Sequence, residues 1–365
     1  MIETVEPLVR PDIAGMEPYT PILPYEVLSA QLGIPPEEIV KLDANENPYG
    51  PSPKVREAIL NANLHIYPDP ESRLLRSALA AFTGVPADYI MAGAGADELI
   101  DLTLRALIAP GDVVINCPPT FGMYSFDGAL NGARVVEVGR RADFALDLDG
   151  IEAAAREHNA KLLMICAPNN PDGSLLPAGV LDRLLRLPLV VMLDEAYIEF
   201  SGAASAFTRV PETPNLIVLR TFSKWAGLAG LRVGYGAFPL SLMAHLWKIK
   251  QPYNVNVAGT VAALASLEDV EALMGNVARL VAERERLYKA LGEFNFLHPY
   301  PSRSNFVLCR VEGRDARALK GALAARGVLV RYFDKPGLRN CLRVSAGRPE
   351  HTDALVRALE EINHE

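Results

Sequence analysis

The sequence contains little cysteine, and what it has is scattered. The 365-residue chain carries four cysteines, Cys117, Cys166, Cys309 and Cys341, and no C-x-x-C pair. Disulfide scaffolds and zinc sites need closely spaced cysteines, often with histidines nearby. We therefore expect neither disulfides nor a metal site, and we predict that the four thiols are buried as small hydrophobic groups in a reducing compartment.

Long hydrophobic runs and an excess of positive charge are also missing. No stretch approaches the ~18 apolar residues of a membrane-spanning helix. The N-terminal segment has acids and prolines where a signal peptide has a basic end and an apolar run. Acidic residues outnumber basic ones by 44 to 36, which argues against a nucleic-acid-binding surface. We therefore predict a cytoplasmic protein that binds neither membranes nor nucleic acids.

Short apolar runs alternate with amphipathic segments through the middle of the chain. The segment 96–108 repeats apolar residues at helical spacing. Strands buried on both faces are predicted for the runs at 112–117, 133–138, 161–168, 187–195 and 215–223. This alternation predicts an α/β domain with a mostly parallel sheet and helices on both faces. Ligands of such sheets bind at the carboxyl ends of the strands, so functional residues should directly follow the apolar runs.

The two ends of the chain differ from its middle. From about residue 265 the chain is rich in helix, with strand-like runs at 304–311, 327–333 and 341–347, which is typical of an α+β domain. The first forty-odd residues are rich in proline, and we expect an arm that packs on the C-terminal domain or on a partner subunit. The predicted division is an arm with part of the small domain (1–43), a large domain (44–264) and a small C-terminal domain (265–365).

Lys224 stands in a confined, glycine-rich segment, TFSKWAGLAGLRVGYG (221–236), directly after an apolar run. A lysine is usually a solvated surface residue, so one interpretation is an ordinary loop with a stray charge. The other is a lysine held there for covalent chemistry. Thr221 and Ser223 place two hydroxyls beside it, and Arg232 offers a guanidinium that can clamp a phosphate.

Asp194 ends another strongly apolar run, where an unpaired carboxylate is costly. It precedes Lys224 by about one strand–helix–strand unit, so both residues should lie at carboxyl ends of strands in one sheet. Tyr197 is close enough along the chain to approach the same site. Glu195 and Glu199 can simply face solvent.

Other residues after strands have ordinary explanations as well as functional ones. Backbone N–H groups of Ala96 and Asp97 can cradle a phosphate at a helix start, although the glycines before them can be purely steric. Phe121 can stack on a planar ligand or pack in the core. Asn170 can bond a ligand oxygen or belong to a turn. Together these groups match one cofactor, pyridoxal 5'-phosphate, which needs a lysine, a carboxylate, donors for its phenolic oxygen, a stacking ring and a phosphate cup.

The chain resembles the fold-type I pyridoxal-phosphate aminotransferases over nearly its whole length, and within them the histidinol-phosphate aminotransferases. The resemblance is carried by LDANENPYGPSP (42–53), DEAYIEF (194–200), SKWAGLAGLRVGY (223–235) and CLRVSAG (341–347). It implies an aspartate aminotransferase-like large domain with a seven-stranded sheet, and a smaller α+β domain built from both chain ends.

The resemblance also implies roles in cofactor binding. Lys224 would hold the cofactor covalently and act as the catalytic base, and Asp194 would pair with the pyridine nitrogen. Tyr197 and Asn170 would hold the phenolic oxygen, and Phe121 would stack on the ring. The cofactor phosphate would be lined by Ala96, Asp97, Thr221, Ser223 and Arg232. Tyr49 would reach the phosphate of the neighbouring subunit's cofactor, which implies a homodimer with shared active sites.

Substrate binding is implied for Arg331 and Arg343, with Tyr19 and Asn47 as further candidates. The expected reaction interconverts L-histidinol phosphate and 2-oxoglutarate with 3-(imidazol-4-yl)-2-oxopropyl phosphate and L-glutamate, in histidine biosynthesis. An aromatic or broad-specificity aminotransferase and a threonine-phosphate decarboxylase remain alternatives. The chain departs from the family pattern at Phe121, where tyrosine is common, and at Asp172, which replaces the threonine of NNPTG. Neither change should impair cofactor binding much.

Overall fold

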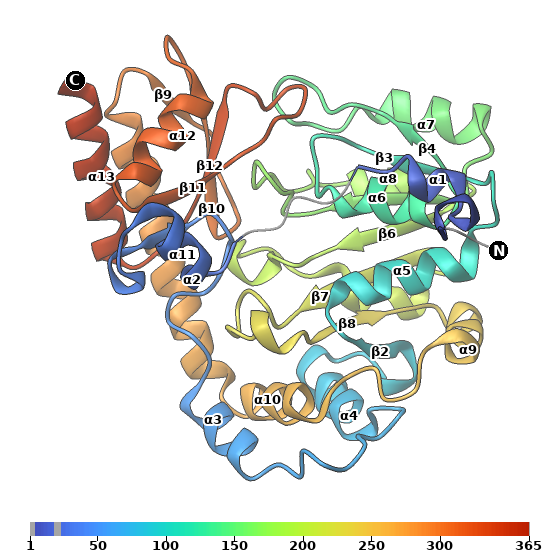
Figure 1. The fold of residues 1–365 in the computed structure, drawn as a ribbon. Coiled ribbons are helices and arrows are strands. Elements are labelled where there is room, and N and C mark those ends of the chain that lie inside the picture. Colours follow the sequence, from blue (N-terminus) through green and yellow to red (C-terminus); the bar gives the residue numbers. More distant parts are fainter. Residues whose placement is uncertain (1–3, 18–22, 365) are drawn as a thin grey trace.

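Two β-sheets, each covered by helices, organise the chain (Figure 1). The computed structural model describes residues 4–17 and 23–364. One sheet has seven strands and the other has five. The predicted Tyr19 lies outside the described residues.

The large sheet has the strand order β2-β8-β7-β6-β5-β3-β4. Its strands are β2 (Ile90–Gly93), β3 (Val113–Asn116), β4 (Arg134–Glu137), β5 (Leu162–Cys166), β6 (Val190–Asp194), β7 (Leu216–Thr221) and β8 (Gly234–Ala237). Neighbours from β4 to β7 are parallel, and β8 is antiparallel to both β2 and β7. The predicted seven-stranded, mostly parallel sheet is therefore confirmed.

Two strands of this sheet differ from the sequence-based expectation. β4 was expected to be buried on both faces, but it is the edge strand and its residues Arg134 and Glu137 are exposed. β8 lacks the apolar run that marks the other strands, and no strand was predicted there. A side chain at Gly234 of β8 would place its Cβ 2.3 Å from the backbone nitrogen of Ala96. Close approach of two backbones therefore accounts for the glycine at this position of the strand.

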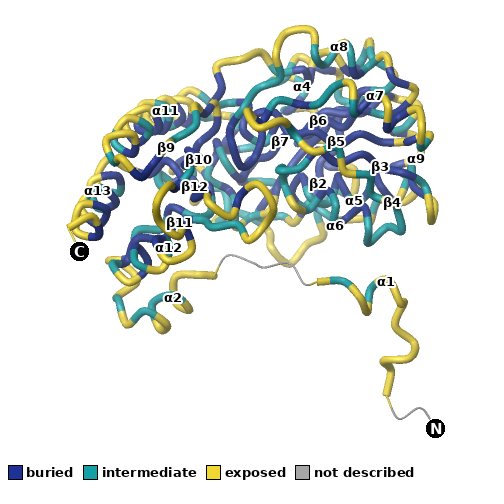
Figure 2. The backbone as a smooth tube through the Cα atoms, turned by 90° about the horizontal axis from the view of Figure 1, so that it is seen from above, coloured by how far each residue is buried: buried dark blue, intermediate teal, exposed yellow. Residues whose placement is uncertain are grey.

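Helices cover both faces of the large sheet (Figure 2). One face carries α5 (Ala96–Leu107), α6 (Met123–Leu130) and α9 (Leu240–Ile249), and the other carries α7 (Leu148–Glu157) and α8 (Val180–Leu184). A further group of helices packs together below β2, formed by α3 (Pro53–Leu60), α4 (Arg73–Thr83) and α10 (Val257–Leu267).

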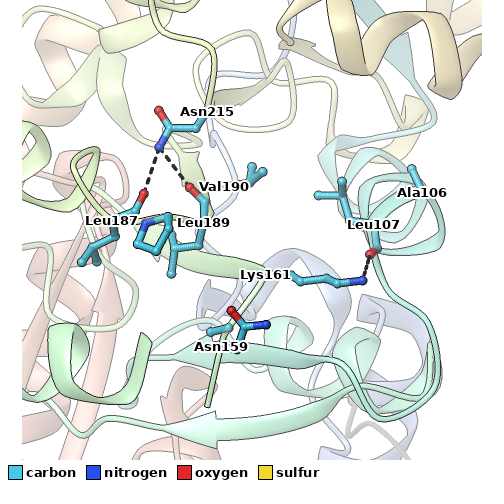
Figure 3. A pocket seen from close by; sticks show the side chains of 10 residues that line it. Ala106, Leu107, Asn159, Lys161, Leu187, Leu189, Val190 and Asn215 are labelled. Carbon is cyan, nitrogen blue, oxygen red and sulfur yellow. Dashed lines mark hydrogen bonds between the residues drawn. The ribbon is translucent and has the colours of Figure 1, made fainter. Parts of the chain in front are cut away.

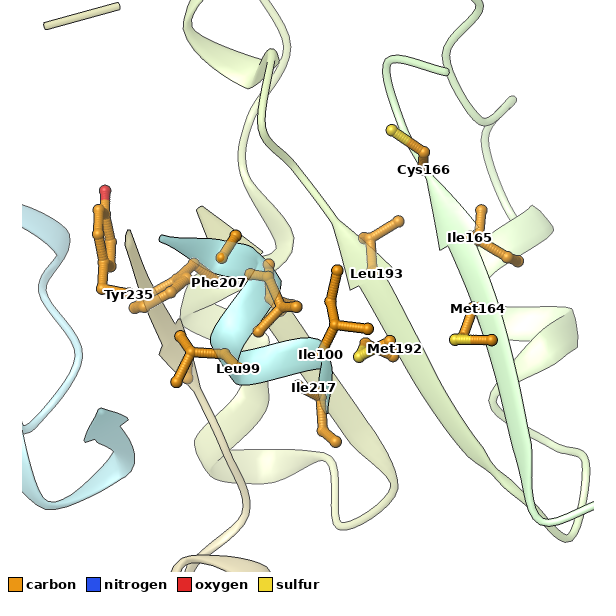
Figure 4. Packing of buried hydrophobic residues seen from close by; sticks show 14 of the residues in the cluster. Leu99, Ile100, Met164, Ile165, Cys166, Met192, Leu193, Phe207, Ile217 and Tyr235 are labelled. Atoms are coloured by element: carbon orange, nitrogen blue, oxygen red, sulfur yellow. The ribbon is translucent and has the colours of Figure 1, made fainter. Parts of the chain in front are cut away.

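The core of the large domain lies between α5 and the sheet. Leu99 and Ile100 of α5 belong to one cluster of buried residues with Met192 of β6 and Ile217 of β7, and Ile100 lies beside the latter two (Figure 4). Each fully buried side chain of this size contributes about 1.5–3 kcal/mol. This packing fixes the start of α5 against the carboxyl ends of the strands.

The small sheet combines residues from both ends of the chain. Its order is β1-β11-β12-β10-β9, with β1 (Val40–Leu42), β9 (Leu297–Pro299), β10 (Phe306–Val311), β11 (Val328–Tyr332) and β12 (Cys341–Ser345). The helices of this part are α11 (Val270–Gly292), α12 (Ala316–Ala325) and α13 (Pro349–His364). The smaller α+β unit is thus present, with β1 parallel to β11.

The N-terminal segment contacts both parts of the chain. α2 (Tyr25–Leu32) packs Leu28 and Leu32 against Ile39 and Leu329 beside the small sheet. α1 (Pro11–Ala14) lies against α6, where Arg10 donates to the Leu130 carbonyl at 3.2 Å. α2 therefore packs beside the small sheet, as expected for the arm, whereas α1 contacts the large domain; packing of the arm on a partner subunit stays a prediction.

All four cysteines are buried and free, as predicted. Short 3-10 turns complete the structure: η1 (Glu6–Leu8), η2 (Pro36–Glu38), η3 (Ala87–Tyr89), η4 (Ile198–Phe200), η5 (Ala206–Glu212) and η6 (Ala229–Leu231). Within the described ranges, no helix combines the length and the apolar character that a membrane crossing requires.

Candidate active site

Three of the predicted cofactor-binding residues lie at the carboxyl ends of three adjacent parallel strands. Asp194 is the last residue of β6 and Thr221 the last of β7, while Asn170 follows β5. Asp194 is in register with Cys166 on one side and with Leu219 on the other. Residues distant in the sequence therefore meet at one edge of the sheet.

Asp194 is buried and accepts two hydrogen bonds. The Tyr124 hydroxyl donates to Oδ2 at 2.6 Å, and the Ala196 N–H donates to Oδ1 at 2.9 Å. Burial raises the pKa of Asp194 to about 6, although both hydrogen bonds favour the carboxylate. The sequence placed Tyr124 near Phe121 but offered no reason to join it to Asp194, which is 70 residues away.

Lys224 follows β7 and is partly buried. Its Nζ lies 6.0 Å from the centroid of the Tyr197 ring. The pKa of Lys224 is lowered to about 8, first by burial and second by the positive charge of Arg343. Lowering the pKa increases the neutral fraction of the amine near neutral pH, and the neutral amine is the form that attacks a carbonyl.

The start of α5 faces Arg232. The guanidinium Nη2 donates to Asp97 Oδ2 at 2.7 Å. The N-cap residue Gly95 has φ +84°, and a Cβ there would lie 2.5 Å from Arg232 Nη2, so a side chain would close this space. Thr221 Oγ1 donates to Ser223 Oγ at 2.9 Å beside it. Helix N–H groups, hydroxyls and a guanidinium thus lie together, and such a set of donors is suited to binding an anion; we call it the cup.

Arg343 of β12 reaches from the small sheet to this edge of the large one. Its Nη1 donates to Asn170 Oδ1 at 2.6 Å, and its Nη2 donates to the Asp43 carbonyl at 2.8 Å. Because the guanidinium occupies the amide oxygen of Asn170, the amide NH₂ group faces elsewhere as a donor.

Arg331 and Arg343 are register partners on β11 and β12. Directly opposed residues project from the same face of a sheet. Each guanidinium also lies over the Phe333 ring, at 5.6 Å for Arg331 and 5.5 Å for Arg343. The pair concentrates positive charge locally in a chain whose net charge is negative.

Three other predicted residues have defined contacts. Tyr49 lies between the guanidiniums of Arg279 and Arg348, at 5.7 and 5.4 Å from its ring centroid. Asn47 Nδ2 donates to the Trp225 carbonyl at 3.0 Å, next to Lys224. Phe121 is partly exposed and meets Tyr124 edge to face.

Glu195 and Glu199 do not face solvent, so that expectation is wrong. Glu195 is buried and accepts from the Ala206 N–H at 2.7 Å and from the Ser205 hydroxyl. Glu199 forms a buried ion pair with Arg220 at 2.6 Å. Arg220 belongs to the neighbouring strand β7, and the sequence alone does not show that this cation lies opposite Glu199.

Comparisons with known proteins agree with this geometry. The aminotransferase class I and II family profile matches residues 37–359. The histidinol-phosphate aminotransferase of Roseiflexus castenholzii is 53% identical over 371 residues, which cover 99% of this chain and all of that relative. The chain belongs to the histidinol-phosphate aminotransferase family.

Solved structures support the same assignment. The histidinol-phosphate aminotransferase of Sinorhizobium meliloti, in complex with pyridoxal 5'-phosphate, matches with a TM-score of 0.89 and 32% identity over 97% of both chains. Aspartate aminotransferase of Thermus thermophilus matches with a TM-score of 0.81 at 21% identity, covering 97% of this chain and 99% of that one, and this likeness concerns the fold alone.

Pyridoxal 5'-phosphate fits the donors that this family member brings together. The ring would find a carboxylate and two hydrogen-bonding side chains, and its phosphate would find the cup at the start of α5. Asp172, which departs from the family pattern, accepts from Asn169 Nδ2 at 2.5 Å and from the Ser174 N–H at 2.9 Å. It therefore shapes the turn that carries Asn170.

A separate groove of about 600 Å³ lies at the opposite, amino end of the strands (Figure 3). Its polar groups are used within the protein. Lys161 pairs with Asp112 at 2.6 Å, and Asn215 Nδ2 donates to the carbonyls of Leu187 and Leu189. Nothing in this groove resembles a reactive site.

Proposed function

We propose that this protein is a pyridoxal-phosphate-dependent aminotransferase acting on a phosphorylated amine. It exchanges the amino group between L-histidinol phosphate and 2-oxoglutarate, giving 3-(imidazol-4-yl)-2-oxopropyl phosphate and L-glutamate, in histidine biosynthesis. The observation that carries this proposal is that Lys224, whose pKa is lowered to about 8, feels the charge of Arg343, which is itself the register partner of Arg331.

In this proposal the protein holds the cofactor ring from several sides. Asp194 would pair with the ring nitrogen, Tyr197 and Asn170 would bond the ring oxygen, and Phe121 would cover one ring face. The phosphate is held by the cup of Ala96, Asp97, Thr221, Ser223 and Arg232. When bound, the cofactor supplies an electron sink for the substrate carbon.

Lys224 has two tasks. Its Nζ would hold the cofactor in the absence of substrate, and as a free amine it would move a proton to or from the reacting substrate carbon. A tethered base of this kind acts at an effective concentration on the order of 10⁵ M or more. Its lowered pKa supports this second task near neutral pH.

The substrate phosphate is assigned to Arg331 and Arg343. A phosphate carries about −1.5 to −2 charges near neutral pH, and a guanidinium can bond two of its oxygens at once. Asn47 and Tyr19 are further candidates for substrate contacts.

We infer that the protein acts as a homodimer with shared sites, in which Tyr49 reaches the partner's cofactor phosphate. An apolar surface supports this inference: Leu64, Ile66 and Tyr67 are exposed by 63%, 55% and 80%. They border a groove in which Tyr67 stacks on Tyr253 at 4.7 Å. Exposed apolar patches of this kind mark interfaces, and a second copy is the expected occupant. A cytoplasmic location stays a prediction.

A half-reaction tests the substrate. The cofactor-loaded protein is mixed with L-histidinol phosphate, L-phenylalanine or L-threonine phosphate, and the absorbance of the lysine-bound cofactor is followed. Rapid loss with the first compound alone is expected. A comparable response to phenylalanine would indicate an aromatic or broad-specificity aminotransferase, and release of carbon dioxide from threonine phosphate would indicate a decarboxylase.

A further inference from the structure

Asn45, in the segment between β1 and α3, connects the two parts of the molecule. It is buried, with 2% of its surface exposed, and its φ is +55°. Its backbone N–H donates to Ser345 Oγ at 2.9 Å, and its carbonyl accepts from Asn305 Nδ2 at 3.0 Å. Its side chain bonds Ser345 and Tyr197.

These contacts fix which way each hydrogen bond points. The Asn45 N–H can only donate, so Ser345 Oγ accepts from it and must direct its own proton elsewhere. The side-chain atom of Asn45 that lies 2.9 Å from Ser345 Oγ accepts that proton, so this atom is the amide oxygen Oδ1. The other end of the amide is therefore the NH₂ group, and it donates to the Tyr197 hydroxyl oxygen at 3.1 Å.

The hydrogen bond from Asn45 determines how the Tyr197 hydroxyl can act. Its oxygen already accepts from Asn45, so its proton is directed away from Asn45. The ring is buried and held edge to face against Phe306 at 5.2 Å, which restricts its movement. On its face lies Lys224, whose Nζ is 6.0 Å from the ring centroid. The Tyr197 proton is therefore available to the site around Lys224.

We propose that Asn45 is a positioning residue that makes Tyr197 an obligatory hydrogen-bond donor to the oxygen of the cofactor ring. Ser345 fixes the orientation of the Asn45 side-chain amide, and this amide fixes the direction of the Tyr197 O–H. The Tyr197 hydroxyl then stabilises negative charge on the oxygen of the cofactor ring. Ser345 is two residues from Arg343 on β12. β12, which carries the proposed substrate-binding Arg343, thus also carries the serine that makes Tyr197 a hydrogen-bond donor to the cofactor. The inference rests on the proposed function.

The direct test is Asn45→Asp, which keeps size and tolerates a positive φ. A carboxylate accepts but does not donate, so it draws the Tyr197 proton away from the ring oxygen. In the cofactor-loaded variant, the absorbance of the lysine-bound cofactor is titrated with pH. Loss of a donor to a charged oxygen disfavours the deprotonated form, so the titration midpoint should rise by about one pH unit. An unchanged midpoint overturns the proposal.

The same substitution in a Tyr197→Phe background separates the effect of redirecting the Tyr197 proton from the direct electrostatic effect of the new carboxylate. Without the hydroxyl, Asn45→Asp should produce little additional shift, and the difference between the two backgrounds measures the coupling. An equal shift in both backgrounds would show that the introduced charge acts directly, which contradicts the proposal.

Asn305→Ala is the matched control. It removes the hydrogen bond to the Asn45 carbonyl but keeps the side-chain hydrogen bonds that link Ser345, Asn45 and Tyr197. We expect a lower melting temperature of the cofactor-free protein with an unchanged titration midpoint. A midpoint shift as large as that of Asn45→Asp would show that loosening of the segment is sufficient, and the proposal would fail. A wild-type protein that never forms the lysine-bound absorbance would instead count against the proposed function.

Discussion

Tyr124 on α6 donates a hydrogen bond of 2.6 Å to Asp194 at the end of β6, and both side chains are buried. The bond fixes the orientation of a carboxylate that burial would otherwise neutralise. The pKa of Asp194 is raised to about 6, so the site holds a costly negative charge at neutral pH before any cationic ring arrives.

The first prediction concerns Asp194→Asn in the cofactor-free protein. Because the folded pKa of Asp194 lies above its ordinary value of 3.8, the folded state binds this proton more tightly than the unfolded state does. Asp194 therefore reduces stability as the pH rises from about 4 to 6, by up to about 3 kcal/mol for two pKa units. Asparagine does not titrate, so the variant should be more stable than wild type at pH 8.

Urea unfolding of the cofactor-free proteins at pH 4.5 and pH 8 measures this effect. The advantage of the variant should shrink toward pH 4.5, and added pyridoxal 5'-phosphate should stabilise the variant less than wild type. A stability difference independent of pH would contradict the raised pKa.

The second prediction concerns Lys224. Its folded pKa is lowered to about 8, so the reactive neutral amine should accumulate as the pH rises through 8. When cofactor is added to cofactor-free protein, the rate of covalent attachment should rise with pH and level off above about 9. Stopped-flow absorbance measures this rate. Lys224→Ala should lose the absorbance and nearly all turnover, and retained turnover would exclude the assigned role.

The third prediction compares two arginines of the C-terminal part. Arg331→Ala should raise the KM for L-histidinol phosphate at least about tenfold, since a hydrogen bond to a charged group contributes about 1.5–3 kcal/mol. Cofactor affinity should stay near wild type. Arg339 is the matched control, because it is 67% exposed and pairs with Asp334. Steady-state kinetics that change equally for both substitutions would argue for a general loss of positive charge.

The fourth prediction concerns the ion pair of Glu199 and Arg220, whose side chains are only 4% and 10% exposed. Glu199→Gln removes the carboxylate that is hydrogen-bonded to the buried guanidinium and leaves only Glu195 as a nearby acidic group, so it should cost up to about 3–5 kcal/mol. Urea unfolding should show a lower midpoint. Asp182→Asn, which breaks the exposed pair with Arg209, should change the midpoint little. Similar effects of the two substitutions would contradict the difference in burial.

Elements whose burial depends only on their own residues could be predicted from the sequence. Apolar runs mark buried parallel strands, so β3, β5, β6 and β7 were predicted within a few residues of their ends. β8 was missed because glycines occupy two of its four positions, Gly234 against the backbone of Ala96 and Gly236 against the side chains of Leu219 and Phe238, which leaves no apolar run.

Site residues that act through a partner were the hardest to predict. Asn45 and Tyr124 bond Tyr197 and Asp194 from 152 and 70 residues away, and neither spacing is periodic. Glu199 was misjudged for the same reason, since its burial depends on Arg220 in the next strand. Pairings of this kind are decided by sheet order, which becomes visible only in three dimensions.

The fifth prediction tests the shared site with mixed subunits. Tyr49→Ala should weaken the site of the partner subunit, and Lys224→Ala should inactivate the site of its own chain. After subunit exchange, a hybrid dimer has one site with both residues intact. Random exchange makes half of the dimers hybrids, so activity at limiting cofactor should recover to about a quarter of wild type. Mixing Lys224→Ala with Asp194→Asn is the control, because both residues belong to one chain's site and no hybrid is intact. Absence of recovery in the first mixture, with exchange shown by native mass spectrometry, would mean that each site is built from a single chain.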